Sequence, residues 1–202
     1  MGEVPRDLPF AAFNQVYASC AAKGLDIGEF IARSPFRKVA YFAVPKDMMV
    51  YEEEYIDILR NRMEGAGKQL ILKRLKFDRH LQARSSRYYE AAVRELFASG
   101  ERPDLLHFSD QVDVRAIIRI AGEYGLRVPE DLNILTCAQT MLNPVPGIFA
   151  VRTDFSKFAA ETFDLCGKLA GRNREPEKHN LTHLISHEIL KLDFESILDI
   201  YC

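Results

Sequence analysis

Residues 102–135 constrain the fold of this chain more than any other stretch of its 202 residues. A candidate strand at 104–108, apolar at Leu105, Leu106 and Phe108, leads to the carboxylate of Asp110. A stretch with helical spacing follows at 111–124, and a second, mostly apolar strand begins at Leu132. Two strands joined by a helix form a βαβ unit, in which the strands pair in parallel. Ligands of such sheets bind at the carboxyl ends of the strands, so the same stretch places a candidate site near Asp110.

These residues resemble the effector-binding core of LacI/GalR-type transcriptional regulators. The family pattern has a Pro-Asp pair, an apolar strand leading to an Asp, a helix, and a Gly-Leu-x-Ile/Val-Pro-Glu-Asp turn before the next strand. This chain carries Pro103-Asp104, Asp110 and Gly125-Leu126-Arg127-Val128-Pro129-Glu130-Asp131 at these places. With weaker likeness at 36–42, 154–171 and 180–188, the resemblance covers residues 9–188. It implies a periplasmic-binding-protein-like α/β fold of type I, built from two lobes.

Apolar periodicity extends the α/β pattern on both sides of this unit. β-branched and aromatic runs predict strands, and i, i+3, i+4 spacing predicts helices. We expect a mostly parallel sheet flanked by helices, with strands at 39–44, 70–75, 104–108 and 132–136 and helices at 52–64, 87–98 and 111–124. Elsewhere we expect strands at 148–151 and 181–185, and helices at 9–23, 154–171 and 194–201.

The resemblance also implies a division of the chain in which the first lobe is largely missing. Residues 1–35 would be a remnant of the first lobe, containing the helix at 9–23, with a connection. Residues 36–145 would form the second lobe, 146–179 a crossover segment and helix of the first lobe, and 180–202 a return strand and tail. Nothing resembles the basic helix-turn-helix head of the family, so DNA would be contacted only through a head absent from this chain.

Charge and composition restrict the partners. The formal net charge is −2 and the pI is about 6.2, which gives no electrostatic reason to expect direct binding of nucleic acid or of an anionic membrane. No run approaches the roughly 18 apolar residues of a membrane span, and the first residues do not resemble a secretory signal. We therefore expect a cytoplasmic protein without a membrane partner.

Metal, cofactor and catalytic signals are weak. The cysteines lie far apart without CxxC spacing, which predicts free thiols: Cys20, Cys137, Cys166 and Cys202. His183 and His187 imitate a metal-ligand spacing, but residues i and i+4 of a strand are about 13 Å apart. The sequence shows no Gly-x-Ser-x-Gly elbow, phosphate loop or paired catalytic carboxylates. We expect no metal, no cofactor and no enzymatic activity.

Asp110 is the main candidate for ligand binding. A carboxylate at the carboxyl end of a strand faces the crevice between lobes, where it can accept two hydrogen bonds from hydroxyl groups of a sugar or similar polyol. The alternative is that Asp110 is the N-cap of the following helix. One residue can serve in both ways.

Tyr51, Gln139 and Arg84 are further candidates for the pocket. Most sugar-sensing members of the family carry an arginine at the place of Tyr51, and Gly-Phe-Asp-Asp where this chain has Thr136-Cys137-Ala138-Gln139. The bidentate clamp and the second carboxylate are therefore absent, which disfavours a standard pyranose effector. Tyr51 by stacking and Gln139 by its amide would line a different pocket, and Arg84 at its mouth would meet an acidic effector. The alternative is that Tyr51 and Gln139 are ordinary loop residues and that Arg84 belongs to a basic loop that only faces solvent.

The helix expected at 111–124 carries more apolar surface than a sheet requires. One stripe would cover the sheet: Val112, Ala116, Ile117, Ile120 and Tyr124. A second stripe, made of Val114, Ile118 and Ala121, would lie on a different face and form the interface of a homodimer. The matching helix of the resembled regulators lies beside the partner subunit. The alternative is that neighbouring loops or residues 194–201 cover this stripe.

These features together predict the ligand-sensing and dimerisation portion of a LacI-type bacterial transcriptional regulator. A small molecule, sugar-like or a related metabolite, would bind between the lobes and favour one of two states, which changes DNA binding by the absent head. One alternative is a solute-binding protein of a transport system with the same fold. An enzyme on the same scaffold is a third reading, which no catalytic constellation supports.

Overall fold

The computed structural model describes residues 15–18, 20–45, 52–76, 86–137, 145–153, 155–170, 182–185 and 187–191. Its main sheet contains β2 (Lys38–Ala43), β3 (Gln69–Arg74), β4 (Leu105–Phe108), β5 (Asn133–Cys137), β6 (Ile148–Thr153) and β8 (His187–Lys191). The helices beside this sheet are α1 (Cys20–Arg33), α2 (Glu52–Gly65), α3 (Ser86–Ala98) and α4 (Val114–Glu123).

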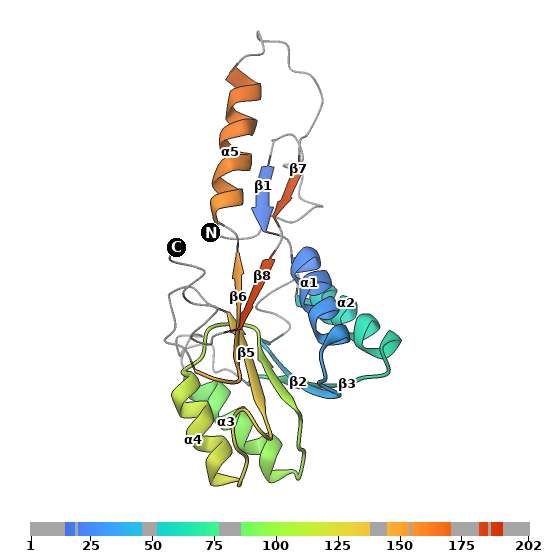
Figure 1. Cartoon of the computed structure of the whole chain (residues 1–202), viewed down its shortest axis with the longest axis vertical. Helices are drawn as coiled ribbons and strands as arrows, with labels where there is room; N and C mark the ends of the chain where they lie inside the picture. Colours follow the sequence, from blue (N-terminus) through green and yellow to red (C-terminus); the bar gives the residue numbers. More distant parts are fainter. Residues whose placement is uncertain are drawn as a thin grey trace.

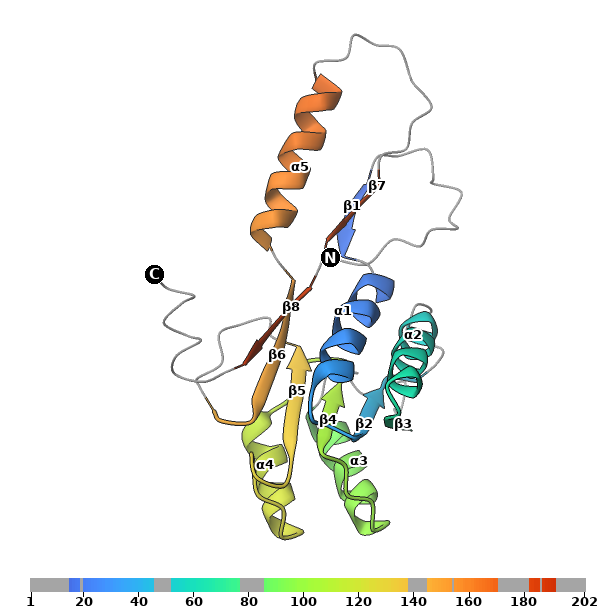
Figure 2. The same cartoon turned by 45° about the vertical axis from the view of Figure 1, so that its right-hand side comes forward.

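The main sheet has the strand order β3-β2-β4-β5-β6-β8 (Figures 1 and 2). β2 pairs in parallel with β3 and β4, and the parallel pairing continues through β5 to β6. β8 runs antiparallel to β6. The expected α/β fold with a mostly parallel sheet is therefore confirmed, and the bounds of β2, β3, β4 and β5 differ by one residue from the expected ones.

Helices cover both faces of the sheet because the strand residues are apolar on both sides. On β2, Ala40 and Phe42 belong to a core shared with α3 and α4, whereas Val39, Tyr41 and Ala43 belong to a core shared with α1 and α2. Strands buried on both faces are typical of parallel sheets with helical crossovers. Figure 2 shows α1 and α2 on one side of the sheet and α3 and α4 below it on the other.

A smaller unit lies beyond one end of the main sheet. β1 (Gln15–Ala18) pairs in parallel with β7 (Thr182–Ile185), and α5 (Phe155–Ala170) contacts both strands. Both views place this unit at the upper end of the molecule (Figures 1 and 2). α5 presents Phe155 and Phe163 with 65% and 78% of their surface exposed. A sheet of two strands is small, because sheets usually have about 4–6 strands.

The helix expected at 9–23 is wrong. Within that range the structure has β1, and a helix that begins only at Cys20 and continues through Gly24 to Arg33. This helix packs on the main sheet through Ile27 and Ile31, so it belongs to the larger unit. Gly24 does not end a helix; it is buried where α1 meets α2. The strand β8 was not expected, and the helix expected at 194–201 lies outside the described residues.

Two aspartates of the most specific sequence stretch have structural roles. The Asp104 carboxylate accepts hydrogen bonds from the backbone N–H groups of Arg37 (2.7 Å) and Lys38 (2.9 Å), which aligns the start of β2 with β4. The Asp131 carboxylate accepts from the backbone N–H of Arg127 at 3.0 Å and so closes the turn before β5. These side chains fix strand positions and lie at the end of the sheet away from Asp110.

We expect Gly24→Leu to lower the free energy of unfolding by about 1–3 kcal/mol, the usual effect of overpacking. A Cβ at Gly24 would lie 3.2 Å from Ile58 Cγ2 and 3.3 Å from Tyr55 Cδ2, so α1 and α2 would have to separate. Gly122 is the control, because a Cβ there meets nothing within 4 Å. Gly122→Ala should raise stability by up to about 1 kcal/mol. Urea unfolding followed by circular dichroism measures both; equal effects would contradict this packing.

Candidate functional site

The candidate site lies at the carboxyl edge of the main sheet, where β2, β4 and β5 end side by side. Asp110 follows β4, Cys137 ends β5, and Val44 follows β2. The backbone N–H of Ser109 donates to the Phe42 carbonyl at 3.2 Å, which keeps the ends of β4 and β2 together. Glu52 at the start of α2 and Lys23 of α1 complete this edge from the helix layer. Carboxyl edges of parallel sheets are the usual place for ligands.

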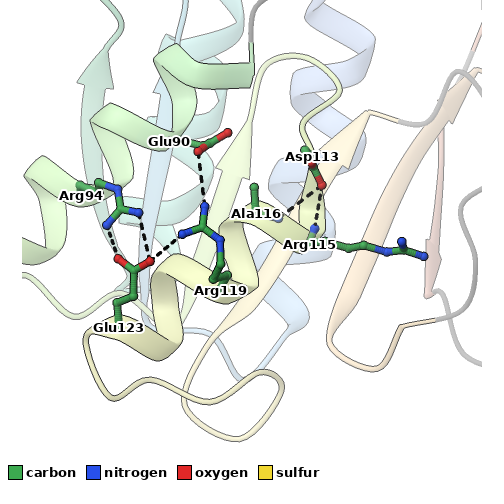
Figure 3. Close-up of polar contacts among 7 residues, drawn as sticks. All are labelled: Glu90, Arg94, Asp113, Arg115, Ala116, Arg119 and Glu123. Carbon is green, nitrogen blue, oxygen red and sulfur yellow. Dashed lines mark hydrogen bonds and ion pairs between the residues drawn. The ribbon is translucent and has the colours of Figure 1, made fainter.

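Asp110 is half-buried and is not the N-cap of α4. Its Oδ1 accepts a hydrogen bond from the backbone N–H of Gln111 at 2.8 Å, and its carbonyl accepts from the Thr136 hydroxyl at 3.1 Å. The N-cap is Asp113, whose Oδ1 accepts from the N–H groups of Arg115 (3.1 Å) and Ala116 (3.3 Å; Figure 3). The N-cap alternative for Asp110 is therefore wrong, and helix capping does not occupy its carboxylate.

Lys23 brings a positive charge to this edge. Its Nζ donates a hydrogen bond to Cys137 Sγ at 3.2 Å and lies 5.8 Å from the centre of the Tyr55 ring. The Cys137 thiol in turn donates to the Ser109 carbonyl at 3.3 Å. These contacts join α1 to the ends of β4 and β5. Cys20, Cys137 and Cys166 form no disulfide, which agrees with the expectation from their spacing.

A buried aromatic group supports the edge from below. The rings of Tyr41 and His107 lie 4.7 Å apart, and the Tyr55 hydroxyl forms a hydrogen bond with His107 Nε2. His107 Nδ1 donates to the Leu135 carbonyl at 3.4 Å, so Nε2 is the acceptor for the Tyr55 hydroxyl. Burial, with the charge of Lys23 as a second cause, lowers the pKa of His107 to about 3. Burial also raises the pKa values of Tyr41 and Tyr55 well above their usual value. All three side chains are therefore neutral at neutral pH.

Glu52 is the buried acid of this edge, with 3% of its surface exposed. Its Oε1 accepts hydrogen bonds from the Tyr41 hydroxyl at 2.7 Å and the Val44 N–H at 3.3 Å. Burial raises the pKa of Glu52, and these hydrogen bonds together with the charges of Arg74 and Lys23 oppose the rise. In the described part of the chain, Glu52 Oε2 and Arg74 Nη1 are buried without a hydrogen-bond partner. Leaving such a group unpaired costs about 1–3 kcal/mol.

The other predicted pocket residues, Tyr51, Gln139 and Arg84, lie outside the described residues. Lys23, Glu52 and His107 also lie at the carboxyl edge of the main sheet, and the sequence did not predict this. His107 offered one signal, since it is the polar residue of a strand whose four residues are all buried. Lys23 offered none, because the helix expected at 9–23 ends at this residue and gives no reason to place it at the edge of the sheet.

The two-stripe interpretation of α4 is wrong. Val114 (8% exposed) and Ala121 (0%) belong to the core between α4 and the sheet, together with Ile117 and Ile120. Ile118 is partly buried against the same core. Residues three, four and seven apart lie on one helical face, so the supposed second stripe is the flank of the first. Val114 and Ala121 are therefore covered within the chain.

The outer face of α4 is polar instead. The Glu123 carboxylate accepts hydrogen bonds from both terminal nitrogens of the Arg94 guanidinium on α3, and from Arg119 Nη1 at 2.7 Å. Arg119 Nη2 lies 3.8 Å from Glu90 Oε2, which completes a network across the two helices (Figure 3). These side chains are partly exposed, so solvent screens each pair and the network contributes little to stability.

The described residues contain neither a candidate metal cluster nor a candidate membrane-spanning helix. None of them forms a cluster of three or more His, Cys, Asp or Glu side chains with the geometry to bind a metal ion. No helix among them is both long enough and apolar enough to cross a membrane.

Comparison with known families identifies the domain. The model of the periplasmic binding protein-like domain matches residues 28–188, and the chain belongs to this family. No curated protein matches the chain.

Solved structures of the same fold include LacI-family regulators, the group that the sequence resembles. A putative LacI-family regulator from Rhizobium etli matches with 17% identity and a TM-score of 0.67, over 90% of this chain and 66% of its own. The dimeric Lac repressor matches with 16% identity and a TM-score of 0.66, over 90% and 64%. A LacI-family regulator from Arthrobacter sp. FB24 in complex with lactose matches with 14% identity and a TM-score of 0.66, over 93% and 68%.

The chain covers only part of its structural neighbours. It spans 61% of the length of an uncharacterised protein from Actinobacillus succinogenes and 66% of a second structure of the Arthrobacter regulator. At 13–17% identity these matches establish the fold.

Proposed function

We propose that this chain is the ligand-sensing portion of a LacI-type transcriptional regulator. A small molecule binds at the carboxyl edge of the main sheet, between this lobe and the unit of β1, β7 and α5. Binding favours one of two arrangements of the lobes and thereby changes DNA binding by a head outside this chain. The family membership, the fold and the LacI-family neighbours support this proposal.

The observation that carries the proposal is the position of Asp110 and the hydrogen-bonding capacity that its carboxylate retains. Asp110 lies at the carboxyl end of β4, is half-buried, and gives its carboxylate to neither the capping of α4 nor an ion pair among the described contacts. An ionised carboxylate has about four acceptor sites, so Asp110 retains capacity for hydroxyl groups of a ligand. Tyr51, Gln139 and Arg84 remain proposed pocket residues.

Self-association belongs to the same proposal. A dimer that uses α4 would place Ile118 and the exposed network of Arg119 and Glu123 against its partner. The dimeric Lac repressor among the structural neighbours supports this part of the proposal. Val114 and Ala121 take no part in it, because both are buried within the chain.

We expect Asp110→Asn to weaken ligand binding by more than about 1.5 kcal/mol, the scale of a hydrogen bond to a charged group. Calorimetry with lactose and with myo-inositol measures this change on the whole chain. Asp113→Asn is the matched control, because it makes the same chemical change three residues away and Asn also caps helices well. Equal affinities of the Asp110→Asn variant and the unmodified chain would remove Asp110 from the site.

A further inference from the structure

Two buried polar atoms lack partners at one corner of the candidate site. Glu52 Oε2 and Arg74 Nη1 are the buried side-chain atoms without a hydrogen bond in the described part of the chain. Arg74 ends β3 and Glu52 begins α2, next to the end of β2. The two side chains are close enough for the charge of Arg74 to lower the pKa of Glu52, yet no hydrogen bond joins them.

We propose that Glu52 and Arg74 form a subsite for one hydroxyl group of an uncharged polyol ligand. The proposal rests on the proposed function and adds a recognition element on the β2–β3 side of the edge, away from Asp110. A hydroxyl has one donor and two acceptor positions. It can therefore accept from Arg74 Nη1 and donate to Glu52 Oε2 at once.

The pairing of opposite charges selects a neutral ligand. An anionic group at this corner would face the Glu52 carboxylate, and an ammonium group would face the Arg74 guanidinium. A hydroxyl suits Glu52 in either protonation state, because it can also accept from a protonated Oε2. Glu52 itself is held in place, since its Oε1 is bound to the Tyr41 hydroxyl at 2.7 Å and to the Val44 N–H.

Movement of the Arg74 side chain would give a ligand access to the proposed subsite. Arg74 Nη2 donates to Glu53 Oε1 at 2.6 Å, and the two side chains are 31% and 33% exposed. An ion pair this exposed is weak, so the guanidinium can swing outward at small cost. A ligand hydroxyl can then reach Arg74 Nη1, and the return of Arg74 completes the hydrogen bonds to the hydroxyl. In this proposal the Arg74 side chain moves when its ion pair with Glu53 breaks, whereas the Glu52 side chain stays in place.

The test is an amide-resolved NMR titration of the full chain with lactose, myo-inositol, gluconate and glucosamine. The Val44 amide reports on the corner because its N–H donates to Glu52. We expect a neutral probe to shift this resonance, and Arg74→Met to weaken that probe at least tenfold. Glu52→Gln, which retains the size of the side chain, should weaken binding of that probe at least threefold.

Glu53→Gln is the matched control, since it breaks the Arg74–Glu53 ion pair, as Arg74→Met does, and leaves both subsite atoms in place. It should bind as well as the unmodified chain or better.

The outcomes separate this inference from the proposed function. If a probe binds and is lost in Asp110→Asn, but Arg74→Met binds it normally, the subsite is wrong and the proposed function stands. Preference for gluconate or glucosamine at the Val44 reporter also overturns the subsite. If no probe shifts Val44, a buried water alone satisfies the two atoms and the subsite is again wrong. Absence of binding of every probe to the unmodified chain counts against both.

Discussion

Phe108→Ala is expected to lower the free energy of unfolding by about 3–5 kcal/mol, the range for removing a buried phenylalanine ring. Phe108 is fully buried at the end of β4, two residues before Asp110. Its ring stacks on Phe42 with centres 4.9 Å apart and meets the edge of Tyr89 at 5.4 Å. The substitution removes these contacts and leaves a cavity between the sheet and α3.

The effect should reach the candidate site. The Tyr89 hydroxyl and the Ser109 hydroxyl lie in hydrogen-bond contact at 2.9 Å, so the Phe108 cavity lies beneath the backbone that presents Asp110. We expect the Ser109 and Asp110 amides to exchange with solvent faster in Phe108→Ala, because local opening no longer disrupts a packed ring. Chemical denaturation gives the stability change, and hydrogen exchange gives its location.

Phe163→Ala is the matched control for this prediction. Phe163 of α5 has 78% of its surface exposed, so the same change of side chain should alter stability by no more than about 0.5 kcal/mol. A comparable loss of stability in both variants would mean that Phe163 is covered in solution and that the main sheet is not the dominant core.

The parallel sheet could be predicted from the sequence because its strands are buried on both faces. Mostly apolar runs such as residues 39–43 and Leu105–Phe108 alternate with helices of regular spacing, and local pattern decides such elements. The N-terminal region could not be predicted in this way. Gly24 reads locally as a helix stop, but its role is to let α2 approach α1, and that contact is tertiary.

The same distinction between local and tertiary features applies to the candidate site. The position of Asp110 could be predicted, because its place after a strand is a local property of the sequence. The other edge residues come together only in the fold: Lys23 contacts Cys137 across 114 residues of sequence, and Tyr55 contacts His107 across 52. The N-cap of α4 could not be assigned from the sequence, because Asp110 and Asp113 both precede the helix. The structure distinguishes them, since α4 begins at Val114, directly after Asp113.

Acidification from pH 7 to pH 5 is expected to remove about 2 kcal/mol of stability through His107 alone. Its pKa is about 3 in the folded chain and about 6.5 when unfolded. Below pH 6.5 the unfolded state binds a proton that the folded state does not, so stability falls as the pH falls. The loss would reach about 4 kcal/mol at pH 3. Glu52 acts in the opposite direction, because its pKa is raised by folding.

His107→Gln isolates this contribution. The glutamine amide cannot titrate but retains one donor and one acceptor for the Leu135 carbonyl and the Tyr55 hydroxyl. Glu52 and the other histidines are present in both proteins, so their effects cancel in the difference. Urea unfolding at pH 7 and pH 5 should show the stability advantage of the unmodified chain shrinking by about 2 kcal/mol. Parallel pH curves for the two proteins would show that His107 is accessible to protons in the folded state, and the buried group beneath the candidate site would then be hydrated.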